Sequence, residues 1–103
     1  MTTENTFSLI KSNIAAVLPN AKIFLFGSRA NGNAHEESDW DILILTKDRP
    51  DRQVKNKVHE VVFPISVNIA AHIDTVIVSE TDWANNPGYY SLHRSVVSKN
   101  MIA

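Results

Sequence analysis

Apolar side chains recur along the chain with two different periods, and each period predicts a type of element. The first set lies at helical spacing: Phe7, Ile10, Ile14 and Val17. It predicts a helix over residues 4–18, which Thr3 can cap and Pro19 ends. Two short apolar runs follow at residues 22–26 and 39–46, and they predict two strands.

The segment between these runs, residues 28–38, is polar and contains Gly32, so it predicts a short helical turn and a loop. A charged turn over residues 47–51 follows the second strand, and Pro50 in it suits the first position of a helix. A third strand is predicted over residues 73–78, where apolar side chains again dominate.

The stretch between the second and third strands repeats apolar residues at helical spacing: Val54, Val58, Val61, Val62, Ile65 and Ile69. Pro64 falls inside this pattern, so it either kinks one helix or separates a helix from an extended piece. We favour a kinked helix over residues 51–70, although the valine and isoleucine content would suit a strand as well.

The end of the chain predicts one more helix. Asn86 and Pro87 match a cap followed by a first helical position. Two rows of side chains lie on the predicted helix: Tyr89, Leu92 and Val96, and Tyr90, His93 and Val97. The order α-β-β-α-β-α predicts an α/β fold with helices packed on a small sheet, and the length of 103 residues fits one domain, residues 1–103.

Composition narrows the function classes. Hydrophobic residues make up 44% and charged residues 20% of the chain, which is ordinary for a globular domain. A net charge of −1 creates no basic field that would draw the protein to nucleic acid or to a membrane, and this argues against a stand-alone polymerase. The chain lacks cysteine, a signal-peptide pattern and an apolar run of membrane-spanning length, so we expect a cytoplasmic location.

The chemistry is concentrated between the first two strands. Gly27-Ser28 ends the first apolar run, and ten residues later Asp39-Trp40-Asp41 opens the second. Side chains two positions apart on a strand point to the same face, so Asp39 and Asp41 repel each other and favour a bound cation. Hard carboxylate oxygens suit Mg²⁺, and a glycine-serine turn with free backbone N–H groups suits the phosphates that accompany it.

This motif resembles that of the nucleotidyltransferase superfamily, which includes DNA polymerase β-like and aminoglycoside nucleotidyltransferases. The strong match covers about a fifth of the chain, and the length and element order look most like the small bacterial minimal nucleotidyltransferases, which often occur beside HEPN-domain partners. The resemblance implies a mixed sheet like the palm of polymerase β. It also implies Mg²⁺ or Mn²⁺ as cofactor and a nucleoside triphosphate as substrate, with ATP expected.

The same resemblance implies roles for individual residues. Asp39 and Asp41 would bind the metal and serve catalysis. A third carboxylate, for which Asp74 at the start of the third strand is the best candidate, would complete the site and help to remove the acceptor proton. Glu80 and Asp82 are weaker alternatives for that role.

Residues for nucleotide binding follow the first strand. Gly27, Ser28 and Arg29 would contact the triphosphate. The family often has a second arginine where this chain has Asn31, so one positive charge is missing. No glycine-lysine-serine/threonine sequence follows, so this is not a Walker A loop.

For the histidine and most aromatic residues, structural roles are favoured over metal binding or catalysis. The four histidines lack zinc-site spacing: His35, His59, His72 and His93. His72 could hydrogen-bond Asp74, but packing or solvent contact is the favoured interpretation. Trp83, Tyr89 and Tyr90 form the expected rim for a partner protein, although such residues are more often core or edge anchors.

Two function classes remain open, with a third that is weaker. The first is an enzyme that transfers NMP, expected to be AMP, to a hydroxyl, and the resemblance implies an antitoxin that modifies a tyrosine of a HEPN-type partner. The second is a binding module that neutralises a toxin by contact alone. The third is modification of a small molecule such as an aminoglycoside. The oligomeric state stays open, and neither a membrane nor nucleic acid is an expected partner.

Overall fold

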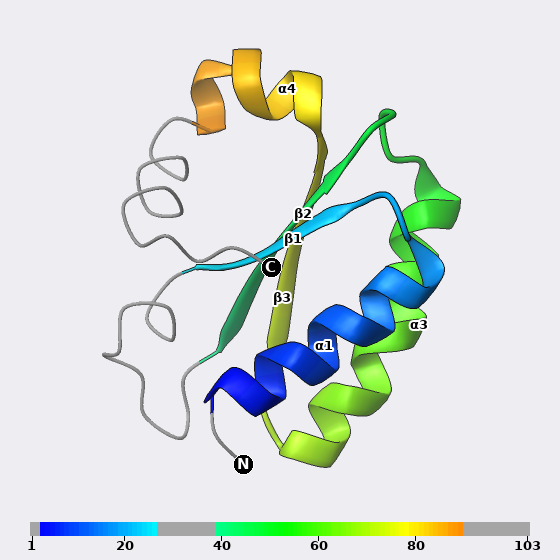
Figure 1. Ribbon diagram of the computed structural model, residues 1–103, viewed down its shortest axis with the longest axis vertical. Helices are drawn as coiled ribbons and strands as arrows, with labels where there is room; N and C mark the ends of the chain where they lie inside the picture. Colours follow the sequence, from blue (N-terminus) through cyan, green and yellow to red (C-terminus); the bar gives the residue numbers. More distant parts are fainter. Residues whose placement is uncertain (1–2, 27–38, 90–103) are drawn as a thin grey trace.

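The computed structural model describes residues 3–26 and 39–89, and its elements follow the predicted order (Figure 1). Their bounds are α1 Thr3–Val17, β1 Lys22–Phe26, β2 Trp40–Thr46, α3 Arg52–Ile69, β3 Ile73–Ser79, α4 Glu80–Asn85 and the 3₁₀ helix η1 Pro87–Tyr89. The turn expected over residues 28–38 and most of the expected final helix lie outside the described residues. None of the helices in the described ranges is long and apolar enough to cross a membrane.

The described strands form a mixed sheet with the order β1-β2-β3. β1 and β2 run antiparallel, whereas β2 and β3 run parallel and are joined through α3. A parallel connection needs a crossover of this kind, because the chain must return to the starting edge before the second strand begins. The predicted α/β fold with a small mixed sheet is therefore confirmed.

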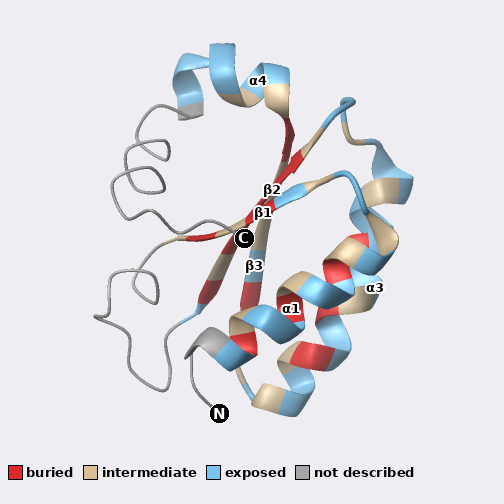
Figure 2. Ribbon diagram, viewed as in Figure 1, coloured by how far each residue is buried: buried red, intermediate tan, exposed pale blue. Residues whose placement is uncertain are grey.

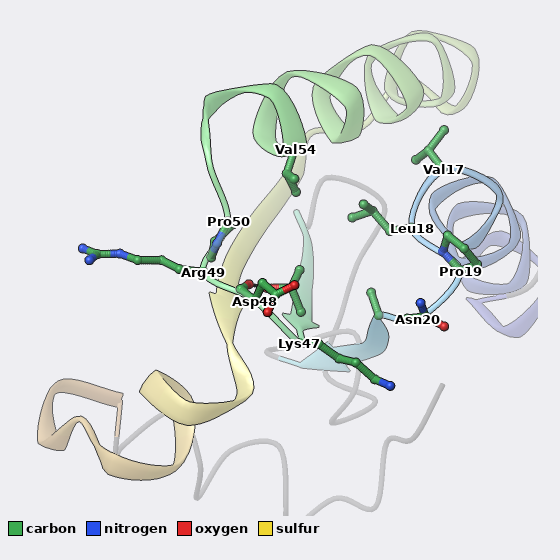
Figure 3. A pocket seen from close by; sticks show the side chains of 11 residues that line it. Val17, Leu18, Pro19, Asn20, Lys47, Asp48, Arg49, Pro50 and Val54 are labelled. Carbon is green, nitrogen blue, oxygen red and sulfur yellow. Dashed lines mark hydrogen bonds between the residues drawn. The ribbon is translucent and has the colours of Figure 1, made fainter.

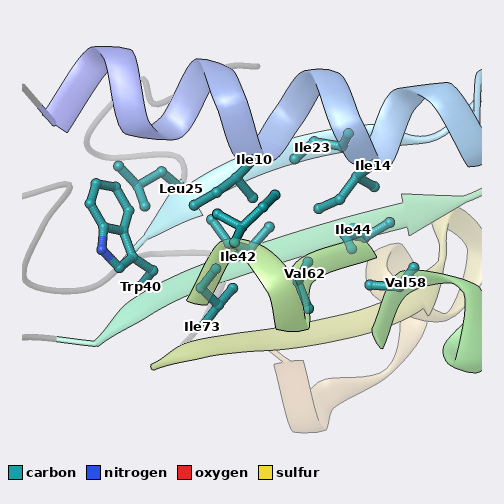
Figure 4. Close-up of a cluster of buried hydrophobic side chains, with 11 residues drawn as sticks. Ile10, Ile14, Ile23, Leu25, Trp40, Ile42, Ile44, Val58, Val62 and Ile73 are labelled. Carbon is teal, nitrogen blue, oxygen red and sulfur yellow. The ribbon is translucent and has the colours of Figure 1, made fainter. Parts of the chain in front are cut away.

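One face of the sheet carries the main core, which α1 and α3 cover (Figures 1 and 2). The buried side chains come from all three strands and both helices: Ile10, Ile14, Ile23, Leu25, Trp40, Ile42, Ile44, Val58, Val62, Ile65 and Ile73. Figure 4 shows Ile10 and Ile14 of α1 and Val58 and Val62 of α3 gathered with side chains of the strands in this core. Most of the apolar spacing read from the sequence on both helices faces this core, whereas Val17 and Val54 lie outside it.

The opposite face, which we call the acid face, has a smaller apolar cluster. Leu43, Leu45 and Val78 are buried there, with Phe24, Phe26, Val76 and Trp83 packed against them. α4 lies over the end of this face where β2 and β3 finish (Figure 1). Lys22 and Glu80 form an exposed ion pair of 3.3 Å that joins the start of β1 to the start of α4.

The crossover helix differs from the sequence expectation at its start. Asp51, not Pro50, is the residue that matters there: it is the N-cap, and its carboxylate accepts a hydrogen bond from the Val54 N–H at 2.9 Å. Pro50 thus lies before the cap rather than at the first helical position. Pro64 sits inside one continuous helix, so the extended alternative is wrong; because Pro64 is exposed, solvent can reach the carbonyl that loses its partner.

The short helix α4 was missed by the sequence analysis. Ser79 caps it, and the Ser79 hydroxyl accepts a hydrogen bond from the Asp82 N–H at 3.1 Å. Glu80 and Asp82 lie in its first turn, where their negative charges stabilise the helix by interacting with the positive end of its dipole. The sequence Ser79-Glu80-Thr81-Asp82 has the spacing of a serine cap followed by an acid, and this was the available signal.

Candidate active site

The register of the parallel strands brings two of the predicted acids together. Asp41 of β2 is the direct partner of Asp74 of β3, on strands about 4.8 Å apart. Both side chains belong to the acid face, because their neighbours Trp40, Ile42 and Ile73 point into the main core on the other side. Two residues that are far apart in the sequence are therefore adjacent at the start of their strands.

Asp39 lies just before β2 and is exposed. Alternation along the chain aims it to the same side as Asp41. Its charge acts on Asp41, as does that of Asp74. The structure thus gathers the three acids that the sequence singled out at one end of the acid face.

This gathering has an electrostatic consequence for Asp41. Burial raises the pKa of the Asp41 carboxyl above its ordinary value, and the Asp74 and Asp39 carboxylates raise it further, while His72 lowers it. The half-buried Asp41 is therefore less easily ionised than an ordinary aspartate. A bound cation would remove this penalty.

His72 contacts the site directly, which corrects the interpretation favoured from the sequence. Its Nε2 lies 2.6 Å from Oδ1 of Asp74, and the two side chains are 66% and 51% exposed. Neither packing nor simple solvent contact describes this residue. The signal was the spacing of two positions: His72 directly precedes β3 and Asp74 is its second residue, so extended chain would aim both side chains to the acid face.

The backbone at the end of α3 fixes where β3 begins. Ala70 adopts the left-handed conformation, with φ 53° and ψ 43°, and ends the helix. The Ala71 N–H then donates to the Ser66 carbonyl at 3.1 Å. At the next residue, His72, the backbone carbonyl accepts a hydrogen bond from the Trp40 N–H at 2.9 Å, which joins the starts of β2 and β3 beside the acids.

The position of the predicted phosphate-binding residues is indicated only by Phe26, the residue that precedes them in the chain. Phe26, the last residue of β1, pairs with Asp41 in the antiparallel register. Gly27, Ser28 and Arg29 come next but lie outside the described residues, so their role remains a prediction. The chain does leave β1 at the level of the acids.

Comparison with known proteins identifies the family to which the chain belongs. A family model described as a nucleotidyltransferase domain matches residues 9–96. The chain belongs to the nucleotidyltransferase domain family. A relative from Methanocaldococcus jannaschii, named a putative protein adenylyltransferase, is 34% identical over 73 residues, which cover 69% of this chain and 74% of the relative.

Solved structures support the fold of this nucleotidyltransferase. The structure of a putative minimal nucleotidyltransferase matches with a TM-score of 0.61 and 17% identity, over 100% of this chain and 95% of that chain. The complex of a tri-AMPylated Shewanella oneidensis HEPN toxin with an MNT antitoxin matches with a TM-score of 0.60 and 17% identity, over 99% and 70% of the two chains. At these identities the likeness shows the fold.

Nucleotidyltransferases typically use a divalent metal ion and a nucleoside triphosphate, so the acids must be tested against a metal. Across residues 3–26 and 39–89, no three histidine, cysteine or acidic side chains close around one point that could hold an ion. Mg²⁺, however, usually takes only one or two carboxylates and completes its shell with phosphates and water. Open, mutually repelling carboxylates therefore fit an ion that arrives with a nucleotide.

The alternative third carboxylates lie at the wrong end of the nucleotidyltransferase sheet. Ser79, which precedes Glu80, is five residues along β3 from Asp74, or about 16 Å. Glu80 is paired with Lys22, and Asp82 lies in α4. Trp83 packs in the apolar cluster at that same end, so it forms no rim beside the acids. Tyr90 is outside the described residues.

A cavity of about 250 Å³ is also remote from the acids. It lies between the end of α1 and the turn after β2, as Figure 3 shows. Its lining includes Leu18, Pro19, Pro50 and Val54, with Lys47 and Arg49 extending away from it. Because it opens where β2 ends and Asp41 lies where β2 begins, the cavity belongs to the opposite end of the sheet.

Proposed function

We propose that this nucleotidyltransferase moves AMP from ATP to a hydroxyl of a partner protein, with Mg²⁺ or Mn²⁺ as cofactor. The observation that carries the proposal is the pairing of Asp41 with Asp74 beside Asp39 on an accessible end of the acid face. Such a site requires acidic ligands whose negative charges are balanced when a metal ion binds together with the nucleotide.

The three acids share the metal in this proposal, and Asp74 has a second role. Asp39, Asp41 and Asp74 would hold the metal, which when bound neutralises charge on the triphosphate. The acceptor oxygen attacks the α-phosphorus, the bond to the bridging oxygen between the α- and β-phosphates breaks, and pyrophosphate leaves. Asp74 accepts the proton from the acceptor hydroxyl. Gly27, Ser28 and Arg29 would hold the phosphates in line for that attack.

The accessibility of the acids favours a macromolecular acceptor. Asp39 is exposed, and the Asp74 side chain is 51% exposed, so a hydroxyl on a protein surface can approach them. The net charge of −1 disfavours a polyanionic acceptor such as nucleic acid. An acceptor protein would also exclude water from the reacting groups when it binds.

The partner that we propose is a small HEPN-type toxin, with this chain as its antitoxin. The fold matches that of a solved complex between an MNT antitoxin and a tri-AMPylated HEPN toxin. It also matches a toxin–antitoxin structure with AMP-PNP, with a TM-score of 0.59 and 21% identity over 100% of this chain and 71% of that chain. The relative from M. jannaschii is named for transfer of adenylate to protein.

Co-expression with the product of the adjacent gene tests this function. Mass spectrometry of the partner should show added AMP on a tyrosine, and Asp41→Asn should lower transfer by about 10²–10³-fold because charge stabilisation is lost. Asp48→Asn, an exposed acid beyond the other end of β2, is the matched control and should transfer normally. A stable complex without modification would instead support neutralisation by contact, and turnover of a small molecule without any complex would support the third function class.

A further inference from the structure

The contact between His72 and Asp74 has no part in the transfer as proposed above. Nε2 of His72 lies 2.6 Å from Oδ1 of Asp74. An ionised carboxylate can only accept hydrogen bonds, so Nε2 of His72 carries the proton and donates it to Oδ1. The distance is at the short end for a bond between a nitrogen donor and an oxygen acceptor.

This contact engages one carboxylate oxygen of Asp74, Oδ1, and leaves the other available. In the part of the chain that the structure describes, the Asp74 carboxylate has no second hydrogen-bond partner. The free oxygen, Oδ2, is the one available to a metal ion or to an acceptor hydroxyl. The bond from His72 therefore determines how the Asp74 carboxylate is turned about its own axis.

Asp74 needs such an orienting contact more than Asp41 does. The Asp74 side chain is 51% exposed on an edge strand of the described sheet, whereas Asp41 is half-buried on the middle strand. An exposed side chain must lose rotamer freedom before it can act in a fixed geometry. His72 removes part of that freedom in advance, and its own backbone is held by the bond from its carbonyl to the Trp40 N–H.

We propose that His72 is a positioning residue that orients the Asp74 carboxylate for metal binding and proton removal. The proposal rests on the function proposed above, since it assumes that Asp74 belongs to the active site. Residues that orient metal-binding carboxylates typically contribute about 10–100-fold to metal affinity or activity. His72 acts through Asp74 and needs no contact with the nucleotide.

Three variants separate positioning from a structural role. His72→Ala removes the donor, His72→Gln keeps an N–H group near the place of Nε2, and His59→Ala changes another exposed histidine, which stacks on Phe63 in α3. Mn²⁺ affinity in the presence of ATP is measured by calorimetry, beside the turnover of AMP transfer. We expect His72→Ala to lower one or both about tenfold or more, His72→Gln to recover most of the loss, and His59→Ala to change neither.

A double-mutant cycle with Asp74→Asn tests whether His72 works through Asp74. His72→Ala should lower Mn²⁺ affinity and turnover in the wild-type background and have no further effect on either in the Asp74→Asn background. Equal losses in both backgrounds would overturn the proposal. So would wild-type affinity and turnover in His72→Ala, or a His72→Gln variant as impaired as His72→Ala.

The same experiment distinguishes failure of this proposal from failure of the proposed function. If Asp41→Asn abolishes binding of Mn²⁺ with ATP and His72→Ala leaves it and turnover unchanged, the function stands and the positioning role is wrong. If the wild-type protein binds no Mn²⁺ with ATP, both are wrong. Thermal unfolding of each variant shows that a loss of affinity is not a loss of fold.

Discussion

The two faces of β2 show how one strand serves two purposes. On the helix-covered face Trp40, Ile42 and Ile44 are at most 3% exposed along the whole strand. On the acid face the strand begins with the half-buried Asp41, and only then do Leu43 and Leu45 become buried. The first face of β2 is buried from Trp40 to Ile44, whereas the second is buried only at Leu43 and Leu45.

The difference teaches where the fold tolerates an unfavourable charge. The end of the acid face where Leu45, Val78 and Trp83 pack is apolar and is covered by α4. At the other end, burial of Asp41 raises the pKa of its carboxyl, and the neighbouring Asp74 and Asp39 carboxylates raise it further. A sheet that is held firmly by one face and one end can keep such a pair at the other end.

The largest expected effect is a loss of turnover when the acid at the start of β3, Asp74, is changed. The acid just beyond the end of β3, Glu80, should not have this effect. Asp74→Asn should lower turnover by about 10²–10⁴-fold because it removes a positioned proton acceptor. Nucleotide affinity should fall much less, since Asp39 and Asp41 remain. Steady-state kinetics of AMP transfer measure both quantities.

Glu80→Gln is the matched control for that variant, because Glu80 lies about 16 Å or more from Asp74 and pairs with Lys22. It should leave turnover unchanged. Normal turnover in Asp74→Asn, or a large loss in Glu80→Gln, would contradict the division between the two ends of the acid face.

The next effect concerns the helix-covered face. Ile42 is fully buried next to Asp41 in the sequence, so Ile42→Ala should lower the free energy of unfolding by about 3 kcal/mol through lost burial and a cavity. Val67 of α3 is 62% exposed, and Val67→Ala should change it by no more than about 0.5 kcal/mol. Urea denaturation measures both variants; similar losses in the two would show that this face is not the source of stability.

A smaller effect tests the capped end of the acid face. Ser79→Ala removes the hydroxyl that accepts the Asp82 N–H, so it should lower the free energy of unfolding by about 1 kcal/mol. Ser79→Thr keeps the acceptor and should restore most of that stability. Binding of Mn²⁺ with ATP should be normal in both variants, because the cap is at the opposite end from Asp74. A loss of metal affinity in Ser79→Ala would indicate that the two ends are coupled.

The smallest effect is a dependence on pH. Because the folded-state pKa of Asp41 is raised, ionisation of Asp41 disfavours the folded state above that pKa, and this penalty is absent below the ordinary carboxyl pKa of 3.8. Asp41→Asn should therefore be more stable than wild type at pH 7 by about 0.5 kcal/mol, after allowance for solvent screening. The difference should shrink towards zero as the pH falls to about 4.

Thermal unfolding across that pH range measures the effect, with Asp48→Asn as an exposed control that should show no such trend. A stability difference for Asp41→Asn that grows as the pH falls would mean that the electrostatic account of the acid pair has the wrong sign.

The parts of the fold that the sequence predicted are those with a local signal. The strands and the two long helices follow from apolar periodicity, and Asp39 and Asp41 share a face through strand alternation. The helix α4 has six residues, which is too short for a periodic pattern, and only its serine cap marks it. The expected first helical position of Pro50 was wrong because Asp51, the next residue, caps the helix with its side chain.

The partnership of Asp41 and Asp74 could be suspected but not located from the sequence. Its register depends on how α3 ends at Ala70 and how the His72 carbonyl meets the Trp40 N–H. The bond between His72 and Trp40 joins segments about 30 residues apart, and no periodicity encodes such a contact. The sequence already favoured Asp74 over Glu80 and Asp82, and β3 adds that Glu80 and Asp82 follow the far end of the strand while Asp74 lies at its start.

The position of β2 in the middle of the described sheet has a consequence for hydrogen exchange. Its backbone is bonded to β1 on one side and to β3 on the other. Amide protons in such a strand exchange only when much of the domain opens, whereas α4, which has no buried residue, can open and exchange alone. Asp41 thus lies on a strand whose amide protons should exchange more slowly than those of α4, and opening of α4 need not break the pairing of β2 with β3.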